Sequence, residues 1–314
     1  MFTIFRKEIA DHFNSTRFLI LFCLVICVAL LTTYMVSMNL RSELSGGAKI
    51  EYLFLTLFTT SGQFFSLTQF IAFFGPLIGI IMGFDAINRE RNSGTLSKLL
   101  SQPVYRDAII NGKFLAGIAT ISIMFISLVL LLSGLGMVVI GVVPTAEEVA
   151  RLVLYMLISI VYVGFWLGLA ILFSIVFRSI GTSALAGVAL WILVSFFIGF
   201  GSGLIADAIA PIEQGNPDQV LRNQRIAETI RRVSPVNLYS DATSTIMDPY
   251  RKTTKSFVLI GPMEKISMSR FNSALPFTQS ILVVAPYLTT LLALTAVCFG
   301  FSYLIFMRQE IRSI

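Results

Sequence analysis

Six long apolar runs constrain this chain more than any other feature of its sequence. They lie at roughly residues 18–38, 64–84, 114–141, 149–177, 182–206 and 281–307. A membrane-spanning helix needs about 20 consecutive apolar residues, because the hydrocarbon layer is about 30 Å thick. Backbone groups within lipid must form their hydrogen bonds inside their own segment, which favours helices. The sequence therefore predicts an all-α integral membrane protein with six transmembrane helices.

The composition excludes a soluble fold. Hydrophobic residues make up 56% of the 314 residues and charged residues only 13%, whereas soluble domains carry about 25% charged residues. The net charge of +6 comes from basic residues dispersed between the apolar runs. No basic groove interleaved with aromatic residues is present, as nucleic-acid binding would require. We expect a lipid bilayer around the chain and no nucleic-acid partner.

Basic residues in short loops predict the orientation, because Lys and Arg favour the cytoplasmic side. With the N-terminus inside, the inner segments carry most of them: Arg6, Lys7, Arg17, Arg89, Arg91, Lys98, Arg106, Lys113, Arg178, Arg308 and Arg312. The short outer loops carry Arg41, Lys49 and Arg151. This asymmetry predicts that both termini are cytoplasmic, in a multi-pass protein of the plasma (inner, cytoplasmic) membrane.

The segment before the first run, residues 1–17, has the pattern of an amphipathic helix. Its apolar residues recur at helical spacing: Phe2, Phe5, Ile9 and Phe13. Its polar residues fall on the opposite side: Lys7, Glu8, Asp11 and Asn14. Such a helix lies in the membrane interface, so we expect an interfacial helix here.

Residues 207–280 separate the fifth and sixth runs and are predicted to lie outside as a helical, extracytoplasmic cap. Asn216 followed by Pro217, and Ser234 followed by Pro235, are typical helix starts. The FVLI sequence at 257–260 is compatible with a short strand.

Glycines recur every four residues in the second run, at Gly75, Gly79 and Gly83, with Pro76 beside the first. The fourth run adds a shorter pair, Gly164 and Gly168. Small residues at this spacing allow two helices to approach closely, either within one subunit or across a dimer. Pro76 removes a backbone hydrogen bond and should bend its helix.

No constellation for catalysis or metal binding is found. The chain lacks a phosphate loop, since Gly112-Lys113 is followed by Phe114. The EEVAR sequence at 147–151 is one residue short of the glutamate–arginine pattern of intramembrane CAAX-type proteases, and His12 is the only histidine. We therefore expect Glu147 and Glu148 to be solvated acids, and no catalytic residue, metal or cofactor in this chain.

The polar and basic segment 85–113, between the second and third runs, is the most specific part of the sequence. Ile87 to Asn92 should continue the second helix, and Gly94 should end it. A short helix would then expose three leucines: Leu96, Leu99 and Leu100. Exposed apolar side chains on a charged loop require a membrane surface or the groove of a partner. The residues thus predict a docking or interfacial loop.

The ordered residues of this loop resemble the signature loop of ABC-2 type permeases, particularly the six-span Nos-type branch. They are Asp85, Glu90, Arg91, Gly94, Thr95, Leu96, Leu99, Leu100, Ser101, Pro103, Arg106, Gly112 and Lys113. The resemblance extends to the N-terminal helix and to SPVNLYSDAT at 234–243, but not to the outer segment at about 249–280.

The resemblance implies that residues 1–314 form a single transmembrane domain, the permease subunit of an ATP-driven exporter. Its partners would be a separate ATPase subunit, which binds ATP and Mg, and a second permease, identical or different. The 85–113 loop would be the coupling helix, contacting the ATPase through Ile87, Arg89, Glu90, Arg91, Gly94, Thr95, Leu96, Leu99 and Leu100. Asp85, Pro103, Arg106 and Lys113 would anchor it. Residues 178–181 would form a second, smaller contact.

Two alternatives remain open from the sequence alone. An autonomous secondary transporter or channel is disfavoured because no run carries a charge near its middle, whereas coupled transporters place carboxylates at membrane depth. A membrane scaffold that docks an ATPase without moving a substrate would share the same loop. The apolar runs are compatible with lipids, hydrophobic peptides, drugs or a sulfur species as substrate.

Overall fold

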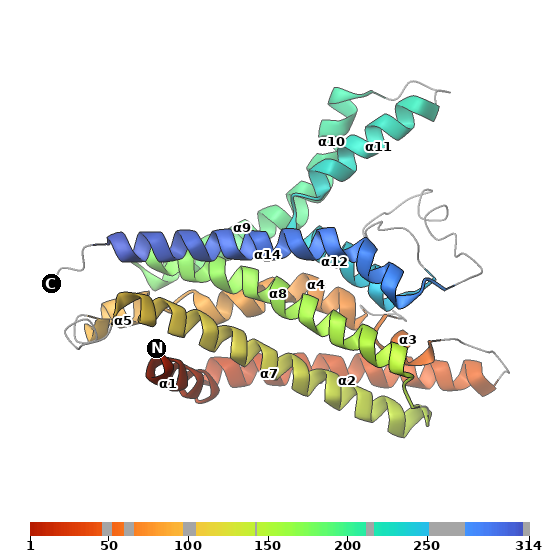
Figure 1. Ribbon diagram of the computed structural model, residues 1–314, viewed down its shortest axis with the longest axis horizontal. Helices are drawn as coiled ribbons and strands as arrows, with labels where there is room; N and C mark the ends of the chain where they lie inside the picture. The colour runs from red at the N-terminus through yellow and green to blue at the C-terminus, as the bar shows by residue number, and fades with distance from the viewer. Residues whose placement is uncertain are drawn as a thin grey trace.

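The computed structural model describes residues 1–45, 52–59, 66–96, 105–141, 143–211, 217–250 and 274–309. These residues are helical and contain no strand (Figure 1). Six helical stretches are long and apolar enough to cross a membrane: Thr16–Met38, Leu67–Asn92, Arg106–Ile140, Ala146–Val176, Ile180–Ile209 and Phe277–Arg308. The predicted six-span, all-α class is therefore confirmed. The predicted strand at 257–260 and the helix start at Asn216 lie outside the described residues.

The described helices fall into a long and a short group. The long ones are α2 (Thr16–Ser45), α4 (Leu67–Gly83), α7 (Arg106–Ile140), α8 (Ala146–Val176) and α14 (Phe277–Arg308). The shorter ones are α1 (Phe2–Phe13), α3 (Leu53–Thr59), α5 (Asn88–Asn92), α9 (Ile180–Ile192), α10 (Ile198–Ile209), α11 (Pro217–Arg231) and α12 (Pro235–Met247). A π-helical turn, η1 (Leu193–Phe197), joins α9 to α10.

Two spans begin with capping boxes, in which a side chain and a backbone N–H at the helix start bond reciprocally. In α4 the pair is Ser66 and Gln69, and in α8 it is Thr145 and Glu148. The Glu148 carboxylate accepts the Thr145 N–H at 2.8 Å and the Phe54 N–H at 2.9 Å, and it is buried. The prediction that Glu148 is a solvated acid is therefore wrong, because α3 covers it.

Helix α8 is the centre of the bundle and packs against α4, α7, α9, α12 and α14. In Figure 1 it runs between α14 and α7. Its largest side chains, Tyr155, Tyr162 and Trp166, are fully buried. Several hydrogen bonds between distant described parts of the chain also have a partner on α8, such as those of Arg151, Tyr162 and Ser174.

Glycines allow α4 to approach α8 at backbone distance. A Cβ atom on Gly79 would lie 2.6 Å from the Val163 carbonyl oxygen, and one on Gly83 would lie 2.9 Å from the Ala170 Cβ. A Cβ on Gly75 would lie 3.0 Å from the Tyr162 side chain, which also belongs to α8. The stripe is thus occupied by packing inside one subunit.

The glycines of α8 face a different helix. A Cβ on Gly164 would lie 2.6 Å from the Ile118 Cδ1, and one on Gly168 would lie 3.5 Å from the Phe114 ring. Both neighbours belong to α7. Helix α8 therefore packs closely against α4 on one side and against α7 on another.

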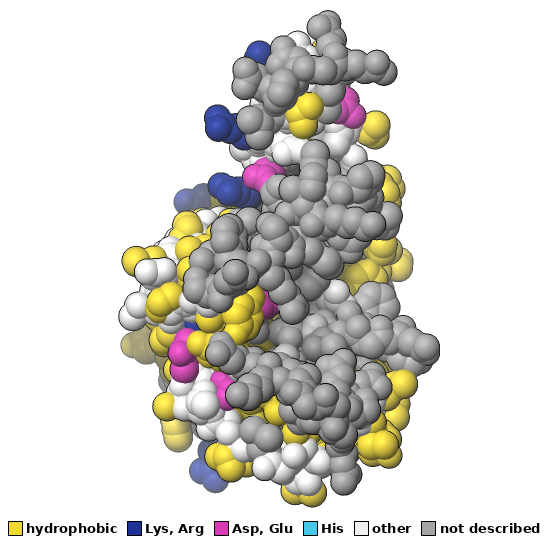
Figure 2. All heavy atoms as spheres, turned by 90° about the vertical axis from the view of Figure 1, so that its right-hand side faces the viewer, with side chains coloured by type: hydrophobic (Ala, Val, Ile, Leu, Met, Phe, Trp, Pro, Cys, Tyr) yellow, Lys and Arg dark blue, Asp and Glu magenta, His cyan; other side chains and the backbone are white. Residues whose placement is uncertain are grey.

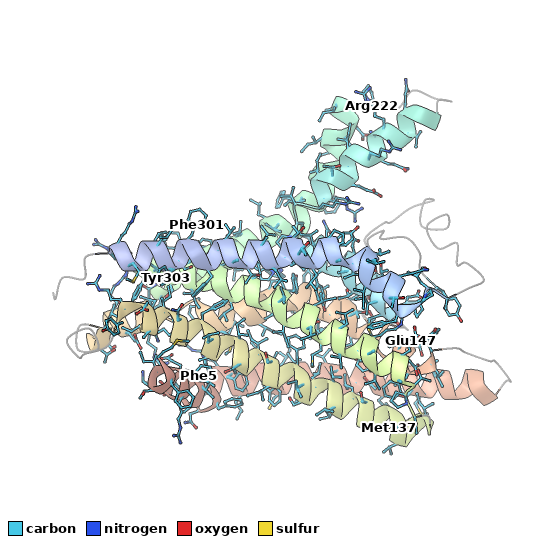
Figure 3. All side chains as sticks on the ribbon, viewed as in Figure 1. Phe5, Met137, Glu147, Arg222, Phe301 and Tyr303 are labelled. Carbon is cyan, nitrogen blue, oxygen red and sulfur yellow. The ribbon has the colours of Figure 1, made fainter. Side chains whose placement is uncertain are left out.

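The fifth span changes direction at η1. Helix α9 lies along the bundle, whereas α10 and α11 form a hairpin that projects from it (Figure 1). Asn223 holds this hairpin together, donating its amide to the Asp207 carboxylate at 2.7 Å and to the Ala210 carbonyl at 2.9 Å. In a view of the end opposite α5, arginine side chains lie on the hairpin (Figure 2). Figure 3 labels Arg222 on α11.

The predicted outer cap at 207–280 includes a helix that belongs to the bundle. Helix α12 packs against α4, α8 and α14, and its Tyr239 is fully buried. The Tyr239 hydroxyl lies 2.8 Å from the Ser159 Oγ, near the middle of α8. Ser234, just before α12, donates to the Val194 carbonyl in the fifth span. This part of the segment is therefore a component of the bundle and does not cover it from outside.

At the end of the bundle opposite α5, a buried arginine on α8 joins three parts of the chain. Arg151 bonds the Glu147 carboxylate at 2.8 Å, the Ile246 carbonyl at 3.0 Å and the Leu275 carbonyl at 2.6 Å. It also donates to the Ser280 Oγ at 3.1 Å. Because Glu147 balances the charge, the arginine is buried without being isolated. Figure 3 shows Glu147 at this end of α8.

Candidate functional site

The predicted docking loop lies at the end of the bundle that also holds α1 and the end of α14 (Figure 1). The structure describes its residues 85–96 and 105–113. Three predicted site residues, Leu99, Leu100 and Pro103, lie outside the described residues. The described part of the segment consists of a turn that follows α4, helix α5, the residues just after it and the start of α7.

Helix α5 rests on the end of α8. The Ser174 Oγ accepts the backbone N–H groups of Ile87 at 2.9 Å and of Asn88 at 3.1 Å. These N–H groups begin a helix and have no partner within it, so a serine of α8 caps α5. The Asn88 amide reaches the Ser179 carbonyl at 3.4 Å. Gly94, with φ of +68°, follows the end of α5 as expected for a helix C-terminus.

Glu90 points into the protein and joins a buried charge cluster. Lys113 Nζ lies 2.9 Å from Glu90 Oε1 and 2.9 Å from Glu8 Oε1. The Lys113 side chain is only 5% exposed. One cation of α7 thus binds carboxylates of α1 and α5. We define these three residues as the lysine cluster.

The charges of the lysine cluster alter the titration of α1. Burial alone would raise the pKa of Glu8, but the charges of Lys113 and Lys7 and the hydrogen bond from Lys113 outweigh it and lower that pKa. Burial also lowers the pKa of His12, so this imidazole is neutral at neutral pH. Glu8 was predicted on the solvated side of α1. The structure instead turns Glu8 toward α7 and leaves Phe2 exposed.

Arg91, next to Glu90, makes a second set of contacts. Its Nη2 donates to the Gln309 Oε1 at 2.9 Å, and the Gln309 Nε2 donates to the Ile175 carbonyl at 3.0 Å. Arg106 donates to the Gln309 carbonyl at 3.0 Å. Gln309 therefore joins α5, α7 and the end of α8 to the end of α14.

Asp85 connects the turn before α5 to the first span. The Arg17 Nη1 lies 2.6 Å from the Asp85 Oδ2, and the Arg17 guanidinium lies over the Phe84 ring at 5.3 Å. The predicted anchor residues Asp85, Arg106 and Lys113 thus each bond an element outside the loop.

The predicted contact residues of the loop divide by exposure. Those that are buried are Ile87, Glu90 and Leu96. Those that are exposed or partly exposed are Arg89, Arg91, Gly94 and Thr95. Asn92, Ser93 and, from the neighbouring turn, Arg178 are also exposed. We define the docking patch as Arg89, Asn92, Ser93, Gly94, Thr95 and Arg178.

Three residues of this region were missed by the sequence analysis: Glu8, Ser174 and Gln309. Each bonds a residue that is far away along the chain, and no local spacing connects the pairs. The signal for Glu8 was weak but present, because this acid directly follows Arg6 and Lys7 in the segment before the first apolar run. Among the described residues, no group of three or more His, Cys, Asp or Glu side chains is placed to hold a metal ion.

The comparison with known families agrees with this layout. A family model described as "ABC-2 family transporter protein" matches residues 2–311. The chain belongs to the ABC-2 transporter family. The predicted family resemblance is therefore confirmed over nearly the whole chain.

This chain is also similar to a curated permease. It is the "Probable ABC transporter permease protein NosY" of Pseudomonas aeruginosa, 27% identical over 182 residues. The match spans 55% of this chain and 60% of the relative. The similarity thus covers less than two thirds of that protein's length.

Proposed function

We propose that this ABC-2 family chain is the permease subunit of an ATP-driven exporter and receives mechanical input at the docking patch. The observation that carries the proposal is that one face of α5 is exposed while the other is bonded to the bundle. Its exposed face presents Arg89 and Asn92, whereas Glu90 and Arg91 connect it to the bundle. The family match and the NosY relative support a membrane subunit in an ABC transporter.

The proposal includes a separate ATPase subunit that binds ATP and Mg, and a second permease subunit. This chain would act as a single transmembrane domain in the plasma membrane, with both termini and α5 in the cytoplasm. The basic residues concentrated at the α5 end support this orientation. The resemblance in the 85–113 loop supports ATPase contact through the docking patch together with Leu99 and Leu100.

The contacts suggest how movement at α5 would spread. A displacement of α5 by the ATPase pulls on Lys113 through Glu90, and therefore on α7 and α1. The same displacement pulls on α14 through Arg91 and Gln309. Helix α4 moves with α5 because only a short turn separates them. A nucleotide bound to another subunit would thus shift the equilibrium between two arrangements of the spans.

The proposal is tested by purifying the tagged chain in mild detergent with its co-purifying proteins and measuring ATP hydrolysis. We expect a phosphate-loop ATPase in the complex, and loss of both the ATPase and its activity in Arg89→Glu. The matched control is Arg222→Glu, which changes another exposed arginine, on the projecting hairpin, and should retain both. Absence of an ATPase from the wild-type complex, or equal loss in both variants, would contradict the proposal.

A further inference from the structure

Helix α4 contains a proline, and another helix replaces the hydrogen bond that this proline removes. Pro76 has no N–H, so the carbonyl of Ala72 loses its partner within α4. An unpaired carbonyl inside a membrane protein is costly, because no water is available to bond it. The Tyr162 hydroxyl of α8 donates to the Ala72 carbonyl at 2.6 Å. The hydrogen bond that Pro76 removes is therefore replaced by a bond between two spans.

The Tyr162 ring is held in place from two sides. Gly75 provides the space on α4, since a Cβ there would lie 3.0 Å from the Tyr162 Cε1. On the other side the ring stacks on Tyr239 of α12, with centroids 4.2 Å apart and planes at 13°. The Tyr239 hydroxyl is itself bonded to Ser159. Helices α4, α8 and α12 thus meet at the Tyr162 side chain.

A second buried tyrosine on the same helix shows that this bond is specific. Tyr155 of α8 is as buried as Tyr162, but its hydroxyl bonds no carbonyl of α4 and instead interacts with the hydroxyls of Tyr239 and Ser159. Burial of a tyrosine on α8 therefore does not by itself lead to a bond with α4. Tyr162 lies opposite the one carbonyl of α4 that Pro76 leaves unpaired.

We propose that Tyr162 is a positioning residue that holds a hinge in the second span. Its hydroxyl fixes α4 at Pro76 in the arrangement described here. When that bond is broken, the half of α4 that leads into α5 bends relative to the half that begins at Leu67. The hinge is a property of this chain alone, and only its use in coupling rests on the proposed function.

The hinge is tested by measuring distances between spin labels in the purified chain in lipid nanodiscs. In a cysteine-free background, one label is placed at Ser93, just after α5, and one at Val149, at the other end of α8; both positions are exposed. We expect Tyr162→Phe to broaden the distance distribution and to raise the bent population on the order of tenfold. Tyr155→Phe, the same chemical change at a tyrosine that bonds no carbonyl of α4, should leave the distribution unchanged.

A second substitution separates the hinge from a general loss of packing. Pro76→Ala restores an N–H for the Ala72 carbonyl, so Tyr162→Phe should have no effect in the Pro76→Ala background. Gly75→Ala displaces the Tyr162 ring while keeping its hydroxyl, and should broaden the distribution even if Tyr162→Phe does not fold. Broadening that persists in the double variant, or that is equal in Tyr155→Phe, would overturn the proposal.

The same variants distinguish the hinge from the proposed function. The distance measurement needs no ATPase, so it reports on the hinge even if the chain is not a permease. ATP hydrolysis by the complex reports on coupling. A broadened distribution with unchanged ATP hydrolysis would retain the hinge and remove it from the coupling path, whereas an unchanged distribution would remove the hinge and leave the permease assignment intact.

Discussion

Single residues determine how α5 is connected, and the lysine cluster is the clearest case. The sequence identified Lys113 and Glu90 as important but assigned Glu90 to a contact with the ATPase. The structure places Glu90 inside the protein, 2.9 Å from Lys113. Sequence reasoning missed this pairing because the two charges lie on different helices and no periodicity relates them. Glu8, more than a hundred positions before Lys113, is still harder to pair.

Lys113→Met should destabilise the protein strongly, because it leaves two carboxylates without their buried cation. Removing one partner of a buried ion pair costs about 3–5 kcal/mol. The matched control is Lys7→Met. Lys7 pairs with Glu8, Asp11 and Glu90, but its side chain is 55% exposed, so its loss should cost less than about 1 kcal/mol. The measurement is the free energy of unfolding of the purified chain in detergent.

A triple variant checks the cause of this effect. Lys113→Met combined with Glu8→Gln and Glu90→Gln removes the uncompensated charges together, and should recover much of the stability lost in Lys113→Met. If the triple variant is as unstable as the single one, packing of the lysine stem and not its charge is responsible.

At the scale of helices, hydropathy was sufficient for the spans but not for α12. The six apolar runs each correspond to a candidate span, with most ends shifted by up to four residues and the spans on either side of the 85–113 segment extending eight residues into it. Helix α12 is short and rich in Ser, Thr and Asp, so its sequence resembles a solvated segment. Its hydroxyls, however, bond its own backbone, as Thr243 does with the Tyr239 carbonyl and Ser244 with the Asp241 carbonyl. Polar groups satisfied within the helix allow it to be buried.

The glycines of α4 give a prediction at this scale. Gly79→Ala would place a methyl group 2.6 Å from the Val163 carbonyl oxygen. Since the contact is with backbone, α4 and α8 must separate, and we expect a loss of about 1–3 kcal/mol. Gly134→Ala, in the interior of α7 with no atom within 4 Å of the added Cβ, should instead be neutral or stabilise by up to about 1 kcal/mol. Equal effects of both, measured by unfolding in detergent, would contradict the close packing of α4 on α8.

The whole molecule has two ends that are held together differently. At the α5 end, ion pairs and side-chain amides join α1, α5, α7, α8 and α14. At the opposite end, one buried arginine binds carbonyl groups of two distant segments. The apolar runs of the sequence predicted the number of candidate spans and their order. The contacts that join the spans depend on packing in three dimensions, which the linear pattern does not contain.

The two ends of the bundle also allow a test of the predicted orientation in the membrane. Ser93 follows α5, and Val143 lies between α7 and α8 at the other end of the bundle; both are exposed. After replacement of Cys23, Cys27 and Cys298, single cysteines at these two positions report on opposite sides. Because loops rich in Lys and Arg stay in the cytoplasm, a membrane-impermeant maleimide should label Val143→Cys in intact cells.

Ser93→Cys should react with the same reagent only after the membrane is permeabilised. Performing the labelling with and without the co-purifying ATPase separates coverage by a partner from location, because a covered cytoplasmic cysteine becomes reactive once the partner is absent and the membrane is open. Labelling of Ser93→Cys in intact cells would show that the chain has the opposite orientation in the membrane. The docking patch would then face away from any source of ATP, and the lysine cluster and Gln309 would need a role other than transmission from an ATPase.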